Sequence, residues 1–171
     1  MSVDEFAALP DDDGVKRELI DGEVYEMASG GRVHETVKGN VNLEFAAWVK
    51  IQKFNARVQS ETRYYLPDIV CQPDVSVVLG NSLGTGESRI TITPDLAVEA
   101  VSSETAQHLN RKIKALLSAG TKAVVAIYPP EREVHIFRTS GIELIPESGT
   151  LRVEDVLPGF AIPVASLFDG L

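Results

Sequence analysis

The two stretches that decide the fold are Gln72-Pro73-Asp74-Val75-Ser76-Val77-Val78 and Pro94-Asp95-Leu96-Ala97-Val98-Glu99-Ala100-Val101-Ser102. Small and branched apolar residues dominate both, as in strands at the buried centre of a sheet. Each stretch also carries an acidic residue, Asp74 in the first and Glu99 in the second. A carboxylate that faces a core is costly unless a partner compensates its charge. If the two strands are neighbours, both carboxylates can bind one cation, and that cation is the functional hypothesis.

The segments around these strands predict an α/β fold of the α+β type, with a mixed β-sheet flanked by helices. Ser2-Val3-Asp4-Glu5 has the form of a capping box and predicts a short first helix that ends at Leu9. Alternation around Asp21-Gly22 predicts a hairpin, since this dipeptide tolerates positive φ angles. Apolar residues at helical spacing predict long helices over 33–49 and 105–119, the second with Gly120 as its C-cap. Strands are predicted over 58–66, 69–79, 96–101, 123–128 and 134–138, a mobile loop over 80–93, and a single domain over 1–171.

The composition and net charge of the chain limit the kinds of partner and compartment that are expected. The net charge of −9 argues against a nucleic-acid partner, because phosphate binding depends on Lys and Arg. The acids are concentrated in residues 1–26, however, and residues 107–122 hold four bases and no acid, so a local basic surface stays open. Neither a signal peptide nor an apolar run of membrane-spanning length is present, which predicts a cytoplasmic protein without a membrane partner. The single cysteine, Cys71, excludes an internal disulfide and is interpreted as a buried apolar residue.

The expected metal follows from the ligands available. Magnesium is held by one or two carboxylates together with water and substrate phosphate, whereas zinc would require a His or Cys cluster that this sequence lacks. Lys112 lies on the helix that follows the Glu99 strand and can turn back toward the end of that strand. There it could orient or activate the attacking water and stabilise the charge of a phosphate in transition. Arg111 and Lys114 are its rivals for this role.

These residues resemble the restriction-endonuclease-like superfamily, whose signature is written PD-(D/E)xK, and more narrowly its branch of small single-domain proteins classed as restriction endonucleases. The resemblance rests on the order and spacing of Glu18-Leu19-Ile20-Asp21-Gly22-Glu23, His34, Gln72-Pro73-Asp74-Val75, Pro94 to Ser102, Lys112 before Ala119-Gly120, and Leu157-Pro158-Gly159-Phe160. It implies a restriction-endonuclease-like core in which Asp74, Glu99 and the carbonyl of Ala100 bind Mg²⁺, with Mn²⁺ as a substitute. It also implies that Lys112 is the catalytic lysine, moved onto the helix from position 101, which is Val101 here.

Two further residues are secondary candidates. Glu18 is expected either to complete the acidic site or to lie on the solvated face of the hairpin. His34 is expected either to contact a phosphate or to make a local hydrogen bond at the start of its helix.

The first functional hypothesis is a magnesium-dependent endonuclease that hydrolyses DNA phosphodiester bonds. One metal site cuts one strand, so a homodimer is expected for a duplex substrate. The second hypothesis is a catalytically inactive binding or assembly module with the nuclease fold. It is favoured by the acidic charge and by Val101, His108 and Leu116, which stand where the family pattern has lysine, aspartate and tyrosine. Hydrolysis of another phosphate ester is a third possibility.

Overall fold

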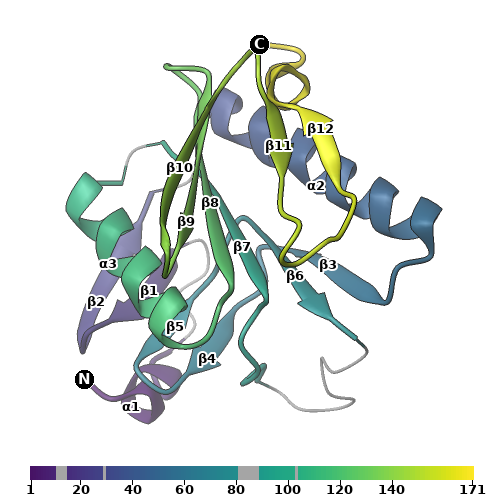
Figure 1. The fold of residues 1–171 in the computed structure, drawn as a ribbon. Helices are drawn as coiled ribbons and strands as arrows, with labels where there is room; N and C mark the ends of the chain where they lie inside the picture. Colours follow the sequence, from purple (N-terminus) through teal and green to yellow (C-terminus); the bar gives the residue numbers. More distant parts are fainter. Residues whose placement is uncertain (11–14, 29, 81–88, 103) are drawn as a thin grey trace.

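The structure is a computed structural model that describes residues 1–10, 15–28, 30–80, 89–102 and 104–171. Its centre is a six-stranded sheet in the order β10-β9-β8-β7-β6-β3 (Figure 1). The strands are β3 (Ala56–Ser60), β6 (Val75–Leu79), β7 (Leu96–Ala100), β8 (Ala123–Tyr128), β9 (Glu133–Arg138) and β10 (Gly141–Pro146). Only the β7–β8 pair is parallel among these strands, and α3 (Ala106–Ser118) connects the two. The predicted mixed sheet with a β-α-β crossover is therefore confirmed.

A smaller sheet, in the order β2-β1-β5-β4, carries the N-terminal hairpin. Its strands are β1 (Lys16–Ile20), β2 (Glu23–Met27), β4 (Tyr64–Leu66) and β5 (Ile69–Cys71). The turn between β1 and β2 is at Asp21 and Gly22, whose φ angles are +52° and +77°, as the Asp-Gly signal predicts. The first helix, α1 (Val3–Ala7), has the predicted capping box between Ser2 and Glu5 and ends two residues before the predicted Leu9.

The strands predicted over 58–66 and 69–79 are each divided in two. The chain leaves the large sheet after β3 and enters the small sheet at β4, then returns from β5 to β6. Glu61, with φ +47°, breaks the first stretch, and Pro73, which has no N–H for a ladder, lies at the second break. Most of the loop predicted to be mobile, residues 81–88, lies outside the described residues.

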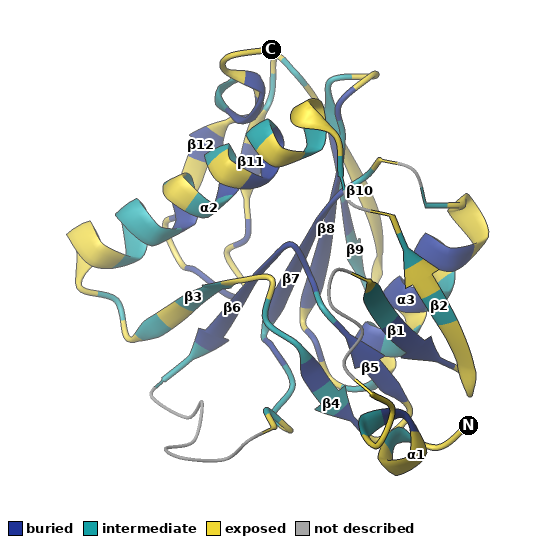
Figure 2. Cartoon of the chain, turned by 180° about the vertical axis from the view of Figure 1, so that it is seen from behind, coloured by how far each residue is buried: buried dark blue, intermediate teal, exposed yellow. Residues whose placement is uncertain are grey.

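The large sheet is covered on both faces (Figure 1). One face packs against α2 (Arg32–Gln52), β11 (Thr150–Arg152), β12 (Ala161–Pro163) and the 3₁₀ helix η1 (Val164–Phe168). The other face packs against α3 and the small sheet. Figure 2 shows that β6, β7 and β8 are buried between these layers, whereas α2 exposes its outer side. The C-terminal strands had no sequence prediction, and they complete the first layer.

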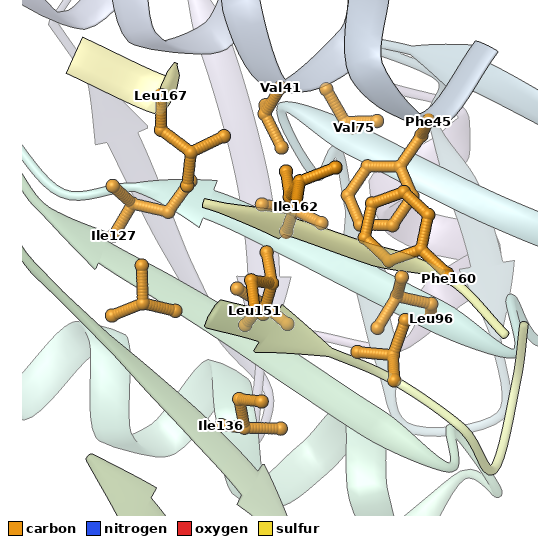
Figure 3. Packing of buried hydrophobic residues seen from close by; sticks show 14 of the residues in the cluster. Val41, Phe45, Val75, Leu96, Ile127, Ile136, Leu151, Phe160, Ile162 and Leu167 are labelled. Carbon is orange, nitrogen blue, oxygen red and sulfur yellow. The ribbon is translucent and has the colours of Figure 1, made fainter. Parts of the chain in front are cut away.

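Aromatic packing fixes the layer around α2. The Phe45 ring of α2 stacks on the Phe160 ring, with centroids 4.5 Å apart and an interplanar angle of 10° (Figure 3). Both rings are fully buried in the same apolar cluster as Leu96 and Val75 of the sheet. This stacking ties the C-terminal segment to the long helix.

Among the described helices, none combines the length and apolarity needed to cross a membrane.

Candidate active site

The strand register brings Asp74 and Glu99 together. Strands β6 and β7 are antiparallel neighbours that pair Val75 with Val98 and Ser76 with Ala97. Continuing this register by one pair places Asp74 directly opposite Glu99. Residues that face each other in an antiparallel pair point to the same side of the sheet. The sequence-based expectation that the two carboxylates belong to neighbouring strands is confirmed.

A small pocket of about 180 Å³ opens at this point. Four of the residues selected from sequence line it, together with other side chains of the same region: Asp74, Glu99, Lys112 and His34. Glu18 and Ala100 are not among the described residues that line it. The structure thus brings the main candidates to one place, with Glu18 behind them.

Asp74 is held from several directions. Its Oδ2 accepts a 2.8 Å hydrogen bond from the backbone N–H of Ala100, and its Oδ1 lies 3.3 Å from His34 Nε2 and 3.8 Å from Lys16 Nζ. Burial alone would raise the pKa of this carboxyl, but His34, Lys16 and the Ala100 N–H outweigh it and lower the pKa below the ordinary value. Asp74 is therefore an anion that several groups keep in one orientation.

His34 bridges Asp74 and the neighbouring strand from the first turn of α2. Its Nδ1 donates to the carbonyl of Ala100 at 2.7 Å, since a carbonyl can only accept. Hydrogen bonding to Asp74 raises the pKa of His34, although partial burial opposes this. Gly30 makes room for the ring, because a Cβ at that position would lie 2.1 Å from His34 Cδ2. The expected local hydrogen bond at the start of the helix is not the one observed, because the ring of His34 bonds to Ala100 on a distant strand. The ring lines the pocket, and contact with a phosphate stays a prediction.

Among the three neighbouring bases of α3, Lys112 is the one that lies on the buried face of the helix, toward the pocket. This face also carries Leu109, Ile113 and Leu116, at the spacing of one helical stripe. Lys112 is 2% exposed, and its Nζ lies 2.8 Å from Glu18 Oε1 and 2.7 Å from Glu99 Oε1. Its contact with Glu99 is an ion pair without the directed geometry of a hydrogen bond. The rivals lie outside this face: Arg111 pairs with Glu23 on the surface, and Lys114 is exposed.

Glu18 is fully buried, so the solvated-face interpretation of this residue is wrong. Its Oε1 accepts the backbone N–H of Gln72 at 2.9 Å, and its Oε2 lies 3.2 Å from His108 Nε2. Burial would raise the pKa of Glu18, but Lys112, His108 and the Gln72 N–H lower it to about 2. The carboxylate is an internal anion with a cation or donor on each oxygen.

The pKa of Glu99 is shifted in the opposite direction from that of Glu18. Burial raises the pKa of Glu99 to about 8; Lys112 opposes this rise, while Asp74 and Glu18 add to it. Glu18 and Glu99 share one ammonium, and Glu18 has two additional donors where Glu99 has a neighbouring anion. Glu99 is thus the carboxylate with the greater need for a further cation.

The donor chemistry of the pocket fits a hard divalent cation. Asp74 Oδ1 and the Ala100 carbonyl oxygen contact different nitrogens of the His34 ring, and the carboxylates of Asp74 and Glu99 both line the pocket. Carboxylate and carbonyl oxygens are ligands that Mg²⁺ accepts. Within the described ranges no three His, Cys, Asp or Glu side chains form a ready-made metal cluster. Asp74 and Glu99 are the carboxylates of the pocket that could hold a cation, and the Ala100 carbonyl would be available to one only if His34 left it.

Sequence reasoning missed several partners of the site. Lys16 approaches Asp74 from β1, and Gln72 uses only its backbone N–H, for which a side-chain motif gives no signal. In the sequence, His108 stands out only as a departure from the family pattern. Its position four residues before Lys112 on the same helical face would have indicated that both reach one partner.

Comparison with known proteins agrees with this fold. A crystal structure described as a "putative nuclease" from Anabaena variabilis superposes with a TM-score of 0.87, at 23% sequence identity, over 98% of this chain and 97% of that chain. At this identity the likeness establishes the fold alone. No curated protein matches the chain. The Uma2 family, described as "Putative restriction endonuclease", matches residues 3–165. Since this match spans nearly the whole sequence, the chain belongs to the Uma2 family of the restriction-endonuclease-like superfamily.

Proposed function

We propose that this protein is a metal-dependent endonuclease that hydrolyses phosphodiester bonds in DNA. The observation that carries the proposal is the register of β6 and β7, which sets Asp74 opposite Glu99 at a pocket that Lys112 also lines. Family membership supports a nuclease rather than another use of the same groups. Mg²⁺ is the proposed cofactor, and Mn²⁺ can substitute for it.

Asp74 and Glu99 would hold the metal with their carboxylates, and Ala100 with its carbonyl oxygen. When bound, such a cation supplies Lewis-acid polarisation of the scissile phosphate and lowers the pKa of water. The Ala100 N–H fixes one oxygen of Asp74, and the other oxygen contacts His34 and Lys16, which both line the pocket. His34 would turn from Asp74 and Ala100 toward the substrate phosphate.

Lys112 would act through its positive charge. Burial opposes that charge, but Glu18 and Glu99 raise the pKa of Lys112 well above its ordinary value, so the side chain stays an ammonium. A permanently charged ammonium cannot take a proton from water. It can orient the attacking water and stabilise the negative charge that develops on the phosphate.

One such pocket addresses one strand, so we propose that a homodimer cleaves duplex DNA. Two copies related by a two-fold axis would present two pockets to the two strands.

The test is cleavage of supercoiled and single-stranded DNA with Mg²⁺ and then Mn²⁺. Asp74→Ala and Lys112→Ala are expected to lose cleavage, while Asp68→Ala, which alters another Pro-Asp pair in an exposed turn, should cleave like the parent. Circular dichroism would establish that all variants are folded. An Asp74→Ala variant that cleaves at the parental rate would rule out the assignment.

A second candidate is a non-catalytic binding or assembly module. One observation favours it: within the described structure, internal partners already engage Lys112 on two sides and His34 through both ring nitrogens. This candidate predicts that the folded parent cleaves no DNA with either metal and does not bind Mn²⁺.

A further inference from the structure

We infer that Glu18 is a positioning residue, which holds the Lys112 ammonium at the active-site pocket through a carboxylate that touches neither metal nor substrate. This inference rests on the proposed function and assigns Glu18 a role different from completing the metal-binding acids.

The contacts of Glu18 are all internal. Both of its oxygens are engaged, Oε1 with Lys112 Nζ and the Gln72 N–H, and Oε2 with His108 Nε2. The side chain is 0% exposed and lies outside the described lining of the pocket, which Lys112 does line. Glu18 therefore reaches the pocket through two lining residues, the Lys112 ammonium and the backbone N–H of Gln72, and only Lys112 brings a charge to it.

Lys112 needs such a partner because its other contact is with a proposed metal ligand. When Glu99 turns its carboxylate to a metal, the 2.7 Å contact with Lys112 Nζ is weakened or lost. A lysine ammonium on a flexible four-carbon stem would then have no fixed position. Glu18 keeps its 2.8 Å contact in both states, because the metal does not compete for it.

His108 and the hairpin fix Glu18 in turn. His108 Nε2 donates to Glu18 Oε2, and the His108 ring packs on the ring of Tyr25 with centroids 4.5 Å apart. Tyr25 is in β2, and its hydroxyl accepts a hydrogen bond from Arg111 of α3. The hairpin and α3 thus clamp the carboxylate between them.

The experiment compares the parent with Glu18→Gln, which keeps shape and removes charge. Glu23→Gln is the matched control, because it removes an exposed ion pair between the same hairpin and the neighbouring residue of the same helix. Three experiments are made: cleavage kinetics on DNA for kcat and KM, calorimetry for Mn²⁺ affinity, and mass spectrometry for acetylation of Lys112 relative to the exposed Lys114. His108→Phe, which keeps an aromatic ring beside Tyr25 but removes the donor to Glu18, replaces Glu18→Gln if that variant does not fold.

We expect kcat of Glu18→Gln to fall by about 10- to 100-fold with KM unchanged, the size of effect seen when a group that orients an active-site residue is removed, and Lys112 acetylation to rise. Mn²⁺ affinity should stay within about 10-fold of the parent, and Glu23→Gln should match the parent in all three. Loss of Mn²⁺ binding in Glu18→Gln would make Glu18 a ligand and overturn the inference. Unchanged acetylation of Lys112 would also overturn it. A parent that binds Mn²⁺ but cleaves no DNA would refute the proposed function alone, and the acetylation result would still decide the inference.

Discussion

The two faces of β6 and β7 carry opposite chemistry. The face toward α2 presents Val75, Val77, Leu96, Val98 and Ala100, all buried in one continuous apolar cluster. The face toward α3 presents Asp74, Ser76, Ala97 and Glu99, in which two carboxylates lie at one end of the strands. The same backbone serves both, because side chains alternate between the faces at every residue.

The two faces therefore have different roles: the α2 face stabilises the fold, and the α3 face carries the groups of the candidate site. Apolar burial on the α2 face needs no partner beyond close packing, and stacking of Phe45 on Phe160 completes it. The α3 face buries three ionisable side chains together, Glu18, Glu99 and Lys112, and a buried charge among them is tolerated only while it keeps its partner. The apolar burial on the α2 face offsets the free-energy cost of burying these groups on the α3 face.

The largest expected effect comes from placing a charge on the apolar face. Val98→Asp would bury a carboxylate inside the apolar cluster, at a cost comparable with the whole stability of a domain, about 5–15 kcal/mol. We expect Val98→Asp to be unfolded and the adjacent Glu99→Gln to unfold cooperatively like the parent. Circular dichroism with urea titration measures both. A folded Val98→Asp variant would show that the α2 face tolerates a buried carboxylate, contrary to this distinction between the two faces.

Removing the shared cation should have the next largest effect. Lys112→Met leaves Glu18 and Glu99 buried without their common ammonium, which we expect to lower the free energy of unfolding by about 3–5 kcal/mol. Adding Glu18→Gln and Glu99→Gln to this variant should recover much of the loss, because no buried charge is then unpaired. Equilibrium urea unfolding of the single and triple variants measures this. Equal stability of the two would show that the charges are not coupled.

The pH dependence of stability should distinguish the two carboxylates in metal-free protein. The pKa of Glu99 is raised to about 8 from 4.5, so its contribution to stability is present at low pH and is lost as the pH rises through 8. The pKa of Glu18 is lowered to about 2, so its contribution is present above 4.5 and is lost as the pH falls toward 2. With EDTA present, Glu99→Gln should therefore gain stability over the parent between pH 6 and pH 9. A constant difference between the two proteins over this range would contradict the assignment.

We expect the smallest change in stability when the exposed ion pair between Glu23 and Arg111 is removed. Glu23 and Arg111 join the same hairpin and helix as Glu18 and Lys112, with a 2.6 Å contact at the surface. Because water and salt screen such a pair, Glu23→Gln should change the free energy of unfolding by less than about 1 kcal/mol. Unfolding in low and high salt measures it. A loss as large as that of Lys112→Met would mean that burial does not set the difference.

The sequence predicted local structure well where one signal acts alone. The Asp-Gly hairpin, the capping box and the two long helices each follow from neighbouring residues, and all are present. The division of residues 56–79 between two sheets was not predicted, because Val58 to Leu66 reads as one strand until the neighbouring strands show that it serves two sheets. Strand pairing of that kind depends on partners distant in sequence.

The sequence by itself determined the fold class and made Asp74 and Glu99 candidates, because these predictions rest on residue type, periodicity and spacing along the chain. The choice of Lys112 over Arg111 and Lys114 rested on the resemblance to the family. Only the tertiary structure decided that Glu18 is buried against Lys112, that His108 and Lys16 join the site, and that His34 reaches from the start of α2 to Ala100. The physical reason is that burial and charge pairing are properties of the assembled layers. The sequence around Glu18 is the same whether its carboxylate is exposed to water or paired with a lysine of a distant helix. Only the packing of the hairpin against α3 shows that Glu18 is buried and paired.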